Sequence, residues 1–493
     1  MISFSEFEEL AQTYNVIPLV RTMLADVVTP VSTYMTLREK GKASFLLESA
    51  EPNEKVGRYS FIGIDPVMVI SVRGNVISVQ ENGAGSERIG NLFEYLCEIM
   101  GKYKTPEHSG SHGFPGGFIG YFGFDCVRQF ENVPVRTEGG LGEPDAVLGL
   151  FTTVVRFDHR SHRLSVIQNV MINPALPLRP QYDEGVKRMS AIELRLRKVA
   201  LGTSNFSANL SEANERFAEA DFCKAVEVAK KHIYEGDIFQ VVLSRSMHLP
   251  FTGDPFQVYR ALRMINPSPY LFYIDFGTTR LIGSSPELLV RVRDDAVDVF
   301  PIAGTRKRGK DEVEDAALAS ELINDAKELA EHIMLVDLGR NDVGRIAEFG
   351  SVEVPVLKHV ERYSHVMHIV SHVRGRLRRD KTSIDALKAC FPAGTVSGAP
   401  KVRAMEIIAA LEPERRGAYS GAVGYLGFRG ELDTCIAIRT IVVHRDMLSM
   451  QSGAGIVADS VPGNEYIETV HKGRVLLEAV RIAANGLQMD GGE

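Results

Sequence analysis

The sequence predicts an α+β fold with mainly antiparallel sheets. Strand-like segments occur in blocks, and so do helix-like segments, whereas a doubly wound parallel sheet would need the two to alternate. The chain has 493 residues and 44% of them are hydrophobic, which is enough for a large core or for more than one domain. The pattern therefore favours antiparallel pairing around a sizeable core.

The first half of the chain consists mainly of short predicted strands. These segments alternate between apolar and polar residues, or are rich in β-branched and aromatic side chains. Strands are expected at residues 43–47, 59–64, 67–72, 76–80, 117–122 and 152–157, and a helix at 91–100. The stretch 201–209 is small, polar and without periodicity, so we expect a linker near 200–215. That linker would separate an N-terminal domain, residues 1–200, from a C-terminal domain, residues 215–485.

The second half begins with a helix that ends at Gly236. Strands are then expected at 238–247, 271–276, 281–283, 288–292 and 297–300, with helices at 313–323 and 327–338. A long helix is expected at 360–373, and Ser397 is expected to cap another helix with Pro400 in its first turn. Two strands, 422–428 and 434–444, precede a last helix from 464 to about 484.

Composition argues against several classes of function. The net charge of −7 argues against nucleic acid or an anionic membrane surface as the main partner. The short basic run 306–310 lacks interleaved aromatics, so it is expected to be a solvated loop. Five cysteines without CxxC spacing are typical of reduced thiols. The acidic start has no signal-peptide pattern, and no apolar run approaches a membrane span, so a cytoplasmic protein is expected.

Two helical segments each carry a pair of glutamates one turn apart. Glu328 and Glu331 form the first pair, and Glu465 and Glu468 the second. Grouped carboxylates without a Cys or His ligand pattern suit a hard cation such as Mg²⁺. The alternative is a solvated helix face, which is the more common role of glutamates at this spacing.

Four glycine-rich segments lie where a strand gives way to a loop or a helix. Glycine lets backbone N–H groups approach and surround an anion, and a helix N-terminus adds partial positive charge. For any single segment an ordinary turn is the simpler interpretation. None has the Walker or GxGxxG spacing, so a nucleotide site is not expected. The segments are residues 301–306, 392–401, 417–425 and 451–457.

Taken together and in this order, these segments resemble the chorismate-utilising enzymes, and within them the large subunit of anthranilate synthase. The resemblance is strong from about 221 to 480 and reaches the N-terminal half through residues 44–49. It implies two large, mainly antiparallel sheets packed face to face with helices outside. It also implies a Mg²⁺-dependent lyase that acts on chorismate.

The resemblance also assigns roles to residues. It implies that Glu331 and Glu468 hold Mg²⁺, with Glu328 and Glu465 as ligands through water. The residues alone do not choose among His365, His368 and His372, but the resemblance places His368 where it would help the C4 hydroxyl leave. Further catalytic residues implied are Thr395 and Gln240. The substrate contacts implied are Gly304, Thr305, Tyr419, Arg439, Gly453, Ala454, Gly455 and Lys472.

Two positions separate this chain from similar enzymes. Aminodeoxychorismate synthase component I, the alternative interpretation, typically has a nucleophilic lysine where this chain has Ala303. Isochorismate and salicylate synthases carry a lysine base at the position of Gln240, and an amide cannot take a proton at neutral pH. Both positions favour direct attack by ammonia. A non-catalytic protein of the same fold would be expected to lack Glu331, Glu468 or His368, and all three are present.

The resemblance implies two partners. None of the five cysteines lies in the glycine-rich elbow of a glutamine amidotransferase, so a separate amidotransferase subunit is expected to supply ammonia, with two copies of each chain in the complex. L-Tryptophan is expected as a feedback inhibitor. Its pocket would involve Ser49, Pro269, Tyr270 and Leu271, where leucine replaces a methionine of similar volume.

Overall fold

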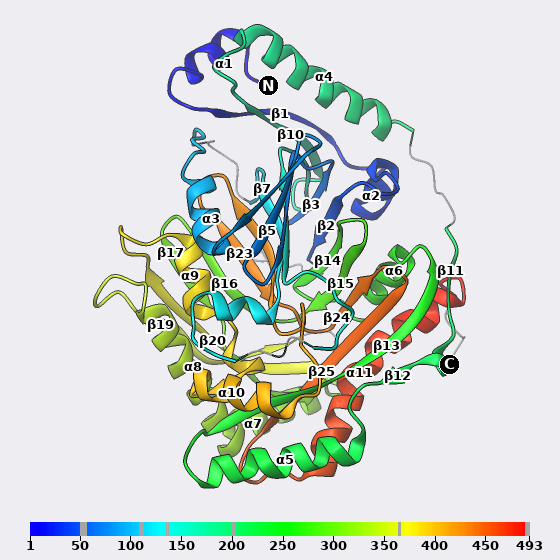
Figure 1. The fold of residues 1–493 in the computed structure, drawn as a ribbon, viewed down its shortest axis with the longest axis vertical. Helices are drawn as coiled ribbons and strands as arrows, with labels where there is room; N and C mark the ends of the chain where they lie inside the picture. The colour runs from blue at the N-terminus through cyan, green and yellow to red at the C-terminus, as the bar shows by residue number, and fades with distance from the viewer. Residues whose placement is uncertain are drawn as a thin grey trace.

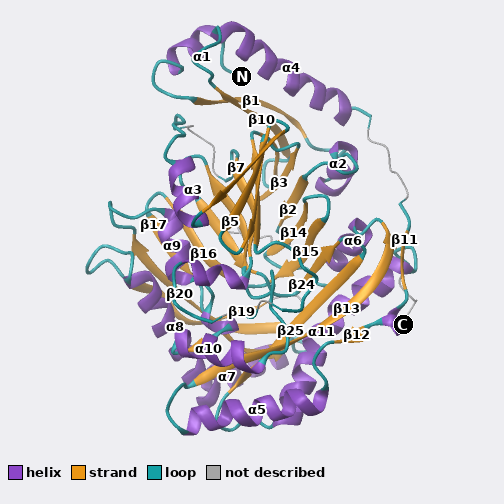
Figure 2. Cartoon of the chain, in the orientation of Figure 1, coloured by secondary structure: helices purple, strands orange, loops and turns teal. Residues whose placement is uncertain are grey.

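The computed structural model describes residues 1–49, 57–107, 113–134, 136, 138–198, 204–362 and 366–488. Two large β-sheets form its centre and helices cover them (Figures 1 and 2). Every strand pair within the described residues is antiparallel, which confirms the predicted fold class. Among the described helices, none is both long and apolar enough to cross a membrane.

The first sheet has 13 strands and draws on both halves of the chain. Two short strands, β12 (Asn214–Glu215) and β21 (Gly398–Ala399), pair with β13 beside its main path. Along that path the order is β1 (Val16–Leu24), β10 (Arg163–Met171), β9 (Thr153–Asp158), β3 (Tyr59–Ile64), β2 (Ser44–Glu48), β14 (Tyr270–Asp275), β15 (Thr279–Ser285), β24 (Thr440–His444), β25 (Met447–Ile456), β13 (Gln240–Gly253) and β11 (Phe206–Ala208).

The second sheet has 12 strands, of which β19 (Glu353–Arg362) pairs with β20 beside the main path. The order along that path is β18 (Ile302–Lys307), β20 (Val366–Arg376), β17 (Ala296–Val299), β16 (Leu288–Arg293), β23 (Leu432–Ile436), β22 (Ala422–Gly427), β7 (Gly117–Phe122), β8 (Ala146–Phe151), β4 (Met68–Arg73), β5 (Val76–Glu81) and β6 (Ala84–Ile89).

Helices surround the sheets, and the pair α8 and α11 positions the candidate metal ligands. Both lie in the lower half of Figure 1, where α5 and α7 also lie. The helices are α1 (Phe4–Leu10), α2 (Pro30–Leu37), α3 (Leu92–Met100), α4 (Leu178–Leu196), α5 (Glu219–Tyr234), α6 (Phe256–Ile265), α7 (Glu312–Asn324), α8 (Ala326–Gly344), α9 (Ser383–Cys390), α10 (Lys401–Leu411) and α11 (Pro462–Ala484).

The two halves of the chain share both sheets. In the first sheet β2 pairs with β14, and in the second β7 pairs with β22, so each sheet runs from N-terminal into C-terminal strands without interruption. The expected boundary near 200–215 therefore falls between two halves that are joined by backbone hydrogen bonds.

A buried cluster between the sheets shows that they pack face to face. It joins Phe45 and Phe272 of the first sheet to Tyr121 and Phe151 of the second. The Phe45 and Phe151 rings meet edge to face with centroids 4.7 Å apart. Replacing either ring with alanine would lower the free energy of unfolding by about 3–5 kcal/mol, because a large cavity would remain.

The predicted helix at 360–373 is wrong, because β19 and β20 occupy that region. Along β20, Met367, Ile369, Ser371 and Val373 are all fully buried, which is the period-two pattern of a strand. The segment is also rich in valine and isoleucine, which favour strands. Several apolar pairs at helical spacing hid this alternation. Residues 363–365, including His365, lie outside the described residues.

Two further boundaries differ from expectation. Ser397 does not cap a helix: its hydroxyl donates to the Ala393 carbonyl, and α10 begins at Lys401 with Pro400 at the cap position. The strand expected at 434–444 is broken into β23 and β24, and Arg439 in the break has a φ of +50°. A left-handed backbone at a non-glycine residue is uncommon and clusters at functional sites.

Candidate active site

Four glutamates from α8 and α11 come within electrostatic reach of one another. Burial raises the pKa of Glu331, and the charges of Glu328 and Glu468 raise it further. Burial also raises the pKa of Glu465, again with a contribution from Glu468. These neighbouring charges show that the four carboxylates concentrate negative charge in one region. Hard oxygen donors in such a region fit Mg²⁺.

Cationic side chains are interposed among these carboxylates. Lys472 Nζ lies 2.5 Å from Glu468 Oε1 and donates to the Gly453 carbonyl at 3.0 Å. Arg306 Nη1 lies 3.1 Å from Glu328 Oε1. Within the described residues, no three of the four glutamates bring carboxylate oxygens within 4.8 Å of one another. Side-chain rotation would therefore be needed for several of them to hold one ion directly.

The Gly304–Thr305 pair forms a bulge in β18. The ladder between β18 and β20 shifts register between Ala303 and Arg306, which releases the two intervening residues from regular pairing. Gly304 has a φ of +66°, and a Cβ at this position would come within 3.1 Å of Glu328 Oε2. Glycine is needed here for both reasons, and it brings the backbone of the bulge next to the first turn of α8.

His368 faces this bulge from β20. Its Nδ1 lies 2.8 Å from the Gly304 carbonyl oxygen and 3.1 Å from Thr305 Oγ1. Burial lowers the pKa of His368, an effect that the hydrogen bond to Gly304 opposes. A neutral imidazole that donates from Nδ1 is the form this geometry favours.

His372, by contrast, is committed to a structural contact. Its Nε2 lies 2.7 Å from Asp298 Oδ1, and its ring stacks on Phe300 at 4.4 Å with a 10° interplanar angle. Burial would raise the pKa of Asp298, but hydrogen bonds from His372 and Arg374 hold it well below its usual value. Of the two described histidines, His368 is the one beside the predicted site.

The predicted glycine loop at 453–455 lies on β25, which pairs with β13. A Cβ at Gly453 would come within 2.9 Å of Tyr419 Oη, and a Cβ at Gly455 within 2.6 Å of Gln240 Nε2. These glycines therefore make room for Tyr419 and Gln240. The structure thus places the 453–455 segment, Tyr419 and Gln240, all predicted site residues, next to one another.

Arg439 supplies positive charge to the same region. Burial lowers the pKa of its guanidinium, and the charges of Tyr419 and Glu468 oppose that shift. Its charge in turn contributes to the lowered pKa of His368. The guanidinium makes no ion pair with any residue in the described part of the chain, so it is available to an anionic ligand.

Glu287 is a candidate acid that the sequence reasoning missed. Thr395 Oγ1, a predicted catalytic atom, donates to Glu287 Oε1 at 2.9 Å. The carboxyl keeps a partial opening to solvent, but the surrounding protein raises its pKa to about 7, against the opposing effects of Thr395 and the Lys472 charge. It lies between β15 and β16 in an apolar stretch, and an acid in such a stretch was the only sequence signal.

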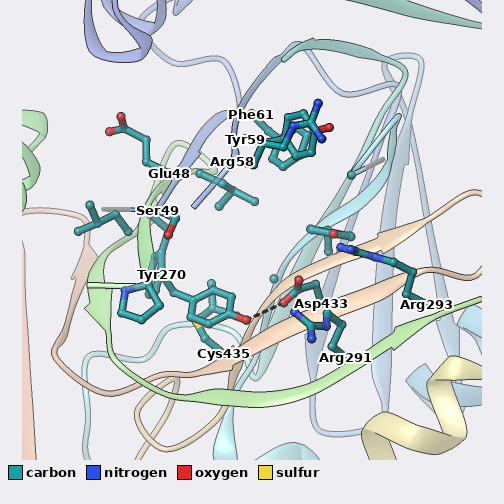
Figure 3. A pocket seen from close by; sticks show the side chains of 18 residues that line it. Glu48, Ser49, Arg58, Tyr59, Phe61, Tyr270, Arg291, Arg293, Asp433 and Cys435 are labelled. Carbon is teal, nitrogen blue, oxygen red and sulfur yellow. Dashed lines mark hydrogen bonds between the residues drawn. The ribbon is translucent and has the colours of Figure 1, made fainter. Parts of the chain in front are cut away.

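A separate cavity of about 290 Å³ lies between the two sheets (Figure 3). Ser49, Pro269, Tyr270 and Leu271 all line it, so the structure brings together the four residues predicted to form an inhibitor pocket. The cavity is near the lower end of the range for small-molecule sites. Its remaining lining is Leu47, Glu48, Arg58, Tyr59, Phe61, Gly113, Phe272, Arg291, Arg293, Val423, Gly424, Tyr425, Asp433 and Cys435.

Charged groups in this cavity have partners within the protein. Tyr270 donates to Asp433 at 2.9 Å, the bond drawn in Figure 3. Burial raises the pKa of Asp433, against the opposing effects of the Arg291 charge and the Tyr270 hydrogen bond. The buried Ser49 hydroxyl, however, has no hydrogen-bond partner among the residues that the structure describes. Such an unsatisfied group in a cavity wall is suited to a polar ligand atom.

Comparisons with known proteins agree on one family. A family model described as chorismate binding enzyme matches residues 42–478. Anthranilate synthase component 1 of Acetivibrio thermocellus is 46% identical over 489 residues, with 98% of each chain covered. The protein of the same name from Pseudomonas aeruginosa is 44% identical over 493 residues, covering 98% of this chain and 99% of the relative.

Solved structures show the same architecture. Anthranilate synthase component I from Streptococcus pneumoniae TIGR4 matches with a TM-score of 0.77 at 37% identity, covering 92% of this chain and 98% of the other. The menaquinone-specific isochorismate synthase of Escherichia coli matches with a TM-score of 0.71 at 20% identity, covering 97% and 98%, and so shares the fold.

Proposed function

This chain belongs to the chorismate-binding enzymes, and from that premise we propose that it is the large subunit of an anthranilate synthase. The proposed reaction converts chorismate and ammonia to anthranilate, pyruvate and water. The observation that carries the proposal is that four carboxylates, the bulge at Gly304 and Arg439, which has no ion pair among the described residues, lie in one region of the molecule.

The substrate's two carboxylates are proposed to bind at opposite ends of this region. Arg439, Lys472 and the backbone of residues 453–455 would hold one anion, and the bulge at Gly304–Thr305 would orient the ring from the other side. Glu331 and Glu468 would hold Mg²⁺ directly, with Glu328 and Glu465 behind them. When bound, Mg²⁺ supplies a Lewis acid and a template for the ring carboxylate.

Ammonia is proposed to attack C2 of the ring while the C4 hydroxyl departs. Hydroxide is a poor leaving group, so it needs a proton as the C–O bond breaks. We assign the proton donor to Glu287, because a carboxyl with a pKa of about 7 keeps its proton close to neutral pH. His368, whose Nδ1–H is donated to Gly304, would orient the C4 hydroxyl by accepting a hydrogen bond from it at Nε2. Loss of pyruvate then makes the ring aromatic.

Two residues support ammonia as the direct nucleophile. Ala303 cannot form the covalent adduct that a lysine at this position would form, and its side chain is buried in β18. Gln240 is packed against Gly455 and cannot act as a base toward water at neutral pH. Aminodeoxychorismate synthase component I, the second candidate, is disfavoured by Ala303.

A glutamine amidotransferase subunit is proposed as the source of ammonia. The buried thiols of Cys126, Cys390 and Cys435 have pKa values raised by burial, the opposite of what a nucleophilic cysteine needs. Cys97 and Cys223 are partly exposed, and burial raises their pKa values as well. The complex would contain two copies of each subunit.

L-Tryptophan is proposed to bind in the cavity between the sheets. Ser49 follows β2 in the N-terminal half and Tyr270 begins β14 in the C-terminal half, so a ligand there would contact both halves. A ligand that binds one arrangement of the two halves better than another would shift the equilibrium between them. This is the proposed route of feedback inhibition.

One assay tests the proposed reaction. The purified chain is mixed with chorismate, Mg²⁺ and ammonium salts at alkaline pH, and anthranilate is followed by its fluorescence. The expected result is Mg²⁺-dependent anthranilate formation with ammonium and none with glutamine alone. A product mixture dominated by 4-amino-4-deoxychorismate or isochorismate in mass spectrometry would refute the assignment.

A further inference from the structure

Arg306 joins the proposed substrate bulge to the proposed metal helix. It follows Thr305 in β18, and its guanidinium contacts three carboxylates of the α7–α8 region. Its Nε lies 3.0 Å from Glu321, its Nη2 lies 3.0 Å from Asp325, and its Nη1 lies 3.1 Å from Glu328.

Glu328 is shared between this arginine and the bulge. One carboxylate oxygen accepts from Arg306, and the other lies where a Cβ at Gly304 would come within 3.1 Å. Asp325 caps α8 by accepting from the backbone of Glu328. A cation drawn to Glu328 would therefore meet the fixed positive charge of Arg306 at the same carboxylate.

The other cations near these glutamates are placed differently. Lys472 contacts Glu468 on α11 and the Gly453 carbonyl. Lys327 is exposed to solvent, and its charge opposes the raised pKa values of Glu331 and Glu465. Without Arg306, the carboxylates of Glu321, Asp325 and Glu328 would add their negative charge to a cluster that already carries Glu331, Glu465 and Glu468.

We propose that Arg306 is a charge-compensating residue, which weakens the hold of the carboxylate cluster on Mg²⁺ alone and lets the metal-loaded site accept a dianionic substrate. This inference rests on the proposed function. A divalent cation gains from uncompensated carboxylates, whereas a substrate with two carboxylates is repelled by them. Arg306 thus lowers the affinity of the site for Mg²⁺ and raises its affinity for the substrate.

The charge and the geometry of Arg306 can be separated by two variants. Arg306→Gln removes the charge, and Arg306→Lys keeps it while losing the planar fork. Arg306→Gln is expected to bind Mg²⁺ about threefold to tenfold more tightly, and chorismate in the presence of Mg²⁺ more weakly by a similar factor. Arg306→Lys is expected to bind both as the unchanged protein does. If Arg306 acted by fixing the position of α8, the lysine variant would fail in the same way as the glutamine variant.

Arg308→Gln is the matched control. Arg308 lies two residues further along, and its partner is Asp315 at 2.7 Å rather than a glutamate of the cluster. This variant removes the same unit of charge close by, so unchanged Mg²⁺ and chorismate affinities would show that the effect of Arg306 depends on its place at Glu328.

The test is calorimetric titration of Mg²⁺ into the full-length chain without substrate, followed by chorismate titration with Mg²⁺ and no ammonia. Thermal unfolding with and without Mg²⁺ checks that each variant is folded and gives a second measure of metal binding. Tighter Mg²⁺ and weaker chorismate binding in Arg306→Gln, with Arg306→Lys unchanged, supports the proposal. Unchanged or weaker Mg²⁺ binding in Arg306→Gln, or a lysine variant that matches it, overturns the proposal. A Glu331→Gln chain that still binds Mg²⁺ normally would instead refute the metal assignment itself.

Discussion

The carboxylate cluster on α8 and α11 and the cavity between the sheets differ in how far their charges are compensated by neighbouring groups. In the cluster, Glu331 and Glu465 have pKa values raised by burial and by neighbouring carboxylates, so negative charge is in excess. In the cavity, Asp433 accepts from Tyr270 and lies near Arg291, so its charge is compensated within the protein.

This difference indicates what each region can bind. Excess carboxylates attract a divalent cation, which then attracts an anionic substrate. A cavity whose charges are already compensated has little net attraction for an ion, and it suits a zwitterion with a large apolar group. The two proposed ligands, Mg²⁺ with chorismate and L-tryptophan, follow this division.

The largest expected effect comes from removing a cluster carboxylate. Glu331→Gln and Glu468→Gln should each lower Mg²⁺-dependent turnover by about a thousandfold or more, because Lewis-acid stabilisation is worth several kcal/mol. Anthranilate fluorescence under saturating chorismate is the measurement. Near-normal turnover of either variant at modest Mg²⁺ would contradict the metal site.

Glu287→Gln should lower kcat by about a hundredfold to ten-thousandfold, because it removes the proposed proton donor. Its raised pKa also sets a sign: the protonated form is present below about pH 7 and is lost as pH rises through that value. At constant free ammonia, wild-type kcat should therefore fall as the pH rises. The fall should begin above about pH 7, because the negative charge of bound chorismate raises the pKa of Glu287 further. The glutamine variant should show a flat profile, and a parallel decline in both proteins would count against Glu287.

Ser49→Phe should weaken tryptophan binding by about tenfold or more, since a ring would fill part of a 290 Å³ cavity. Uninhibited turnover should stay close to normal, because Ser49 is not in contact with the cluster residues described above. Calorimetry with L-tryptophan is the measurement. Unchanged tryptophan binding, or a joint loss of stability and activity, would show that residues 46–49 serve only as a strand end.

Tyr270→Phe should have the smallest effect. It removes the hydroxyl that donates to the half-buried Asp433, which should lower the free energy of unfolding by about 1–3 kcal/mol and leave Mg²⁺ affinity unchanged. Thermal unfolding with and without Mg²⁺ measures both quantities. A change in Mg²⁺ affinity would mean that the cavity and the cluster are not independent in the unliganded chain.

Parts of the fold with a local signal could be predicted from the sequence. The strands β3 and β7 were expected at their observed bounds, because alternation and strand length are local properties. The order of strands in each sheet could not be read in this way, because the pairing of β2 with β14 joins segments far apart in the chain. The helix expected at 360–373 failed because buried alternation in β20 outweighed apparent helical spacing.

The candidate site shows the same limit. Gly304, Gly453 and Gly455 belong to recognisable glycine-rich segments and were assigned to the site through the family resemblance, and the structure explains each by a close approach of another side chain or an unusual φ. Glu287 has no such segment, since its raised pKa comes from its tertiary surroundings. The contact between Arg306 and Glu328 was likewise invisible in the basic run, which reads as an ordinary exposed loop.

The most direct test of this two-site account is calorimetry of both ligands on two variants. Mg²⁺ and L-tryptophan are titrated separately into the unchanged chain, into Glu331→Gln/Glu468→Gln and into Ser49→Phe, all without chorismate. The account predicts that the glutamate variant loses Mg²⁺ binding and keeps tryptophan binding, and that Ser49→Phe does the reverse. Loss of both ligands in either folded variant, or retained Mg²⁺ binding without Glu331 and Glu468, would contradict it.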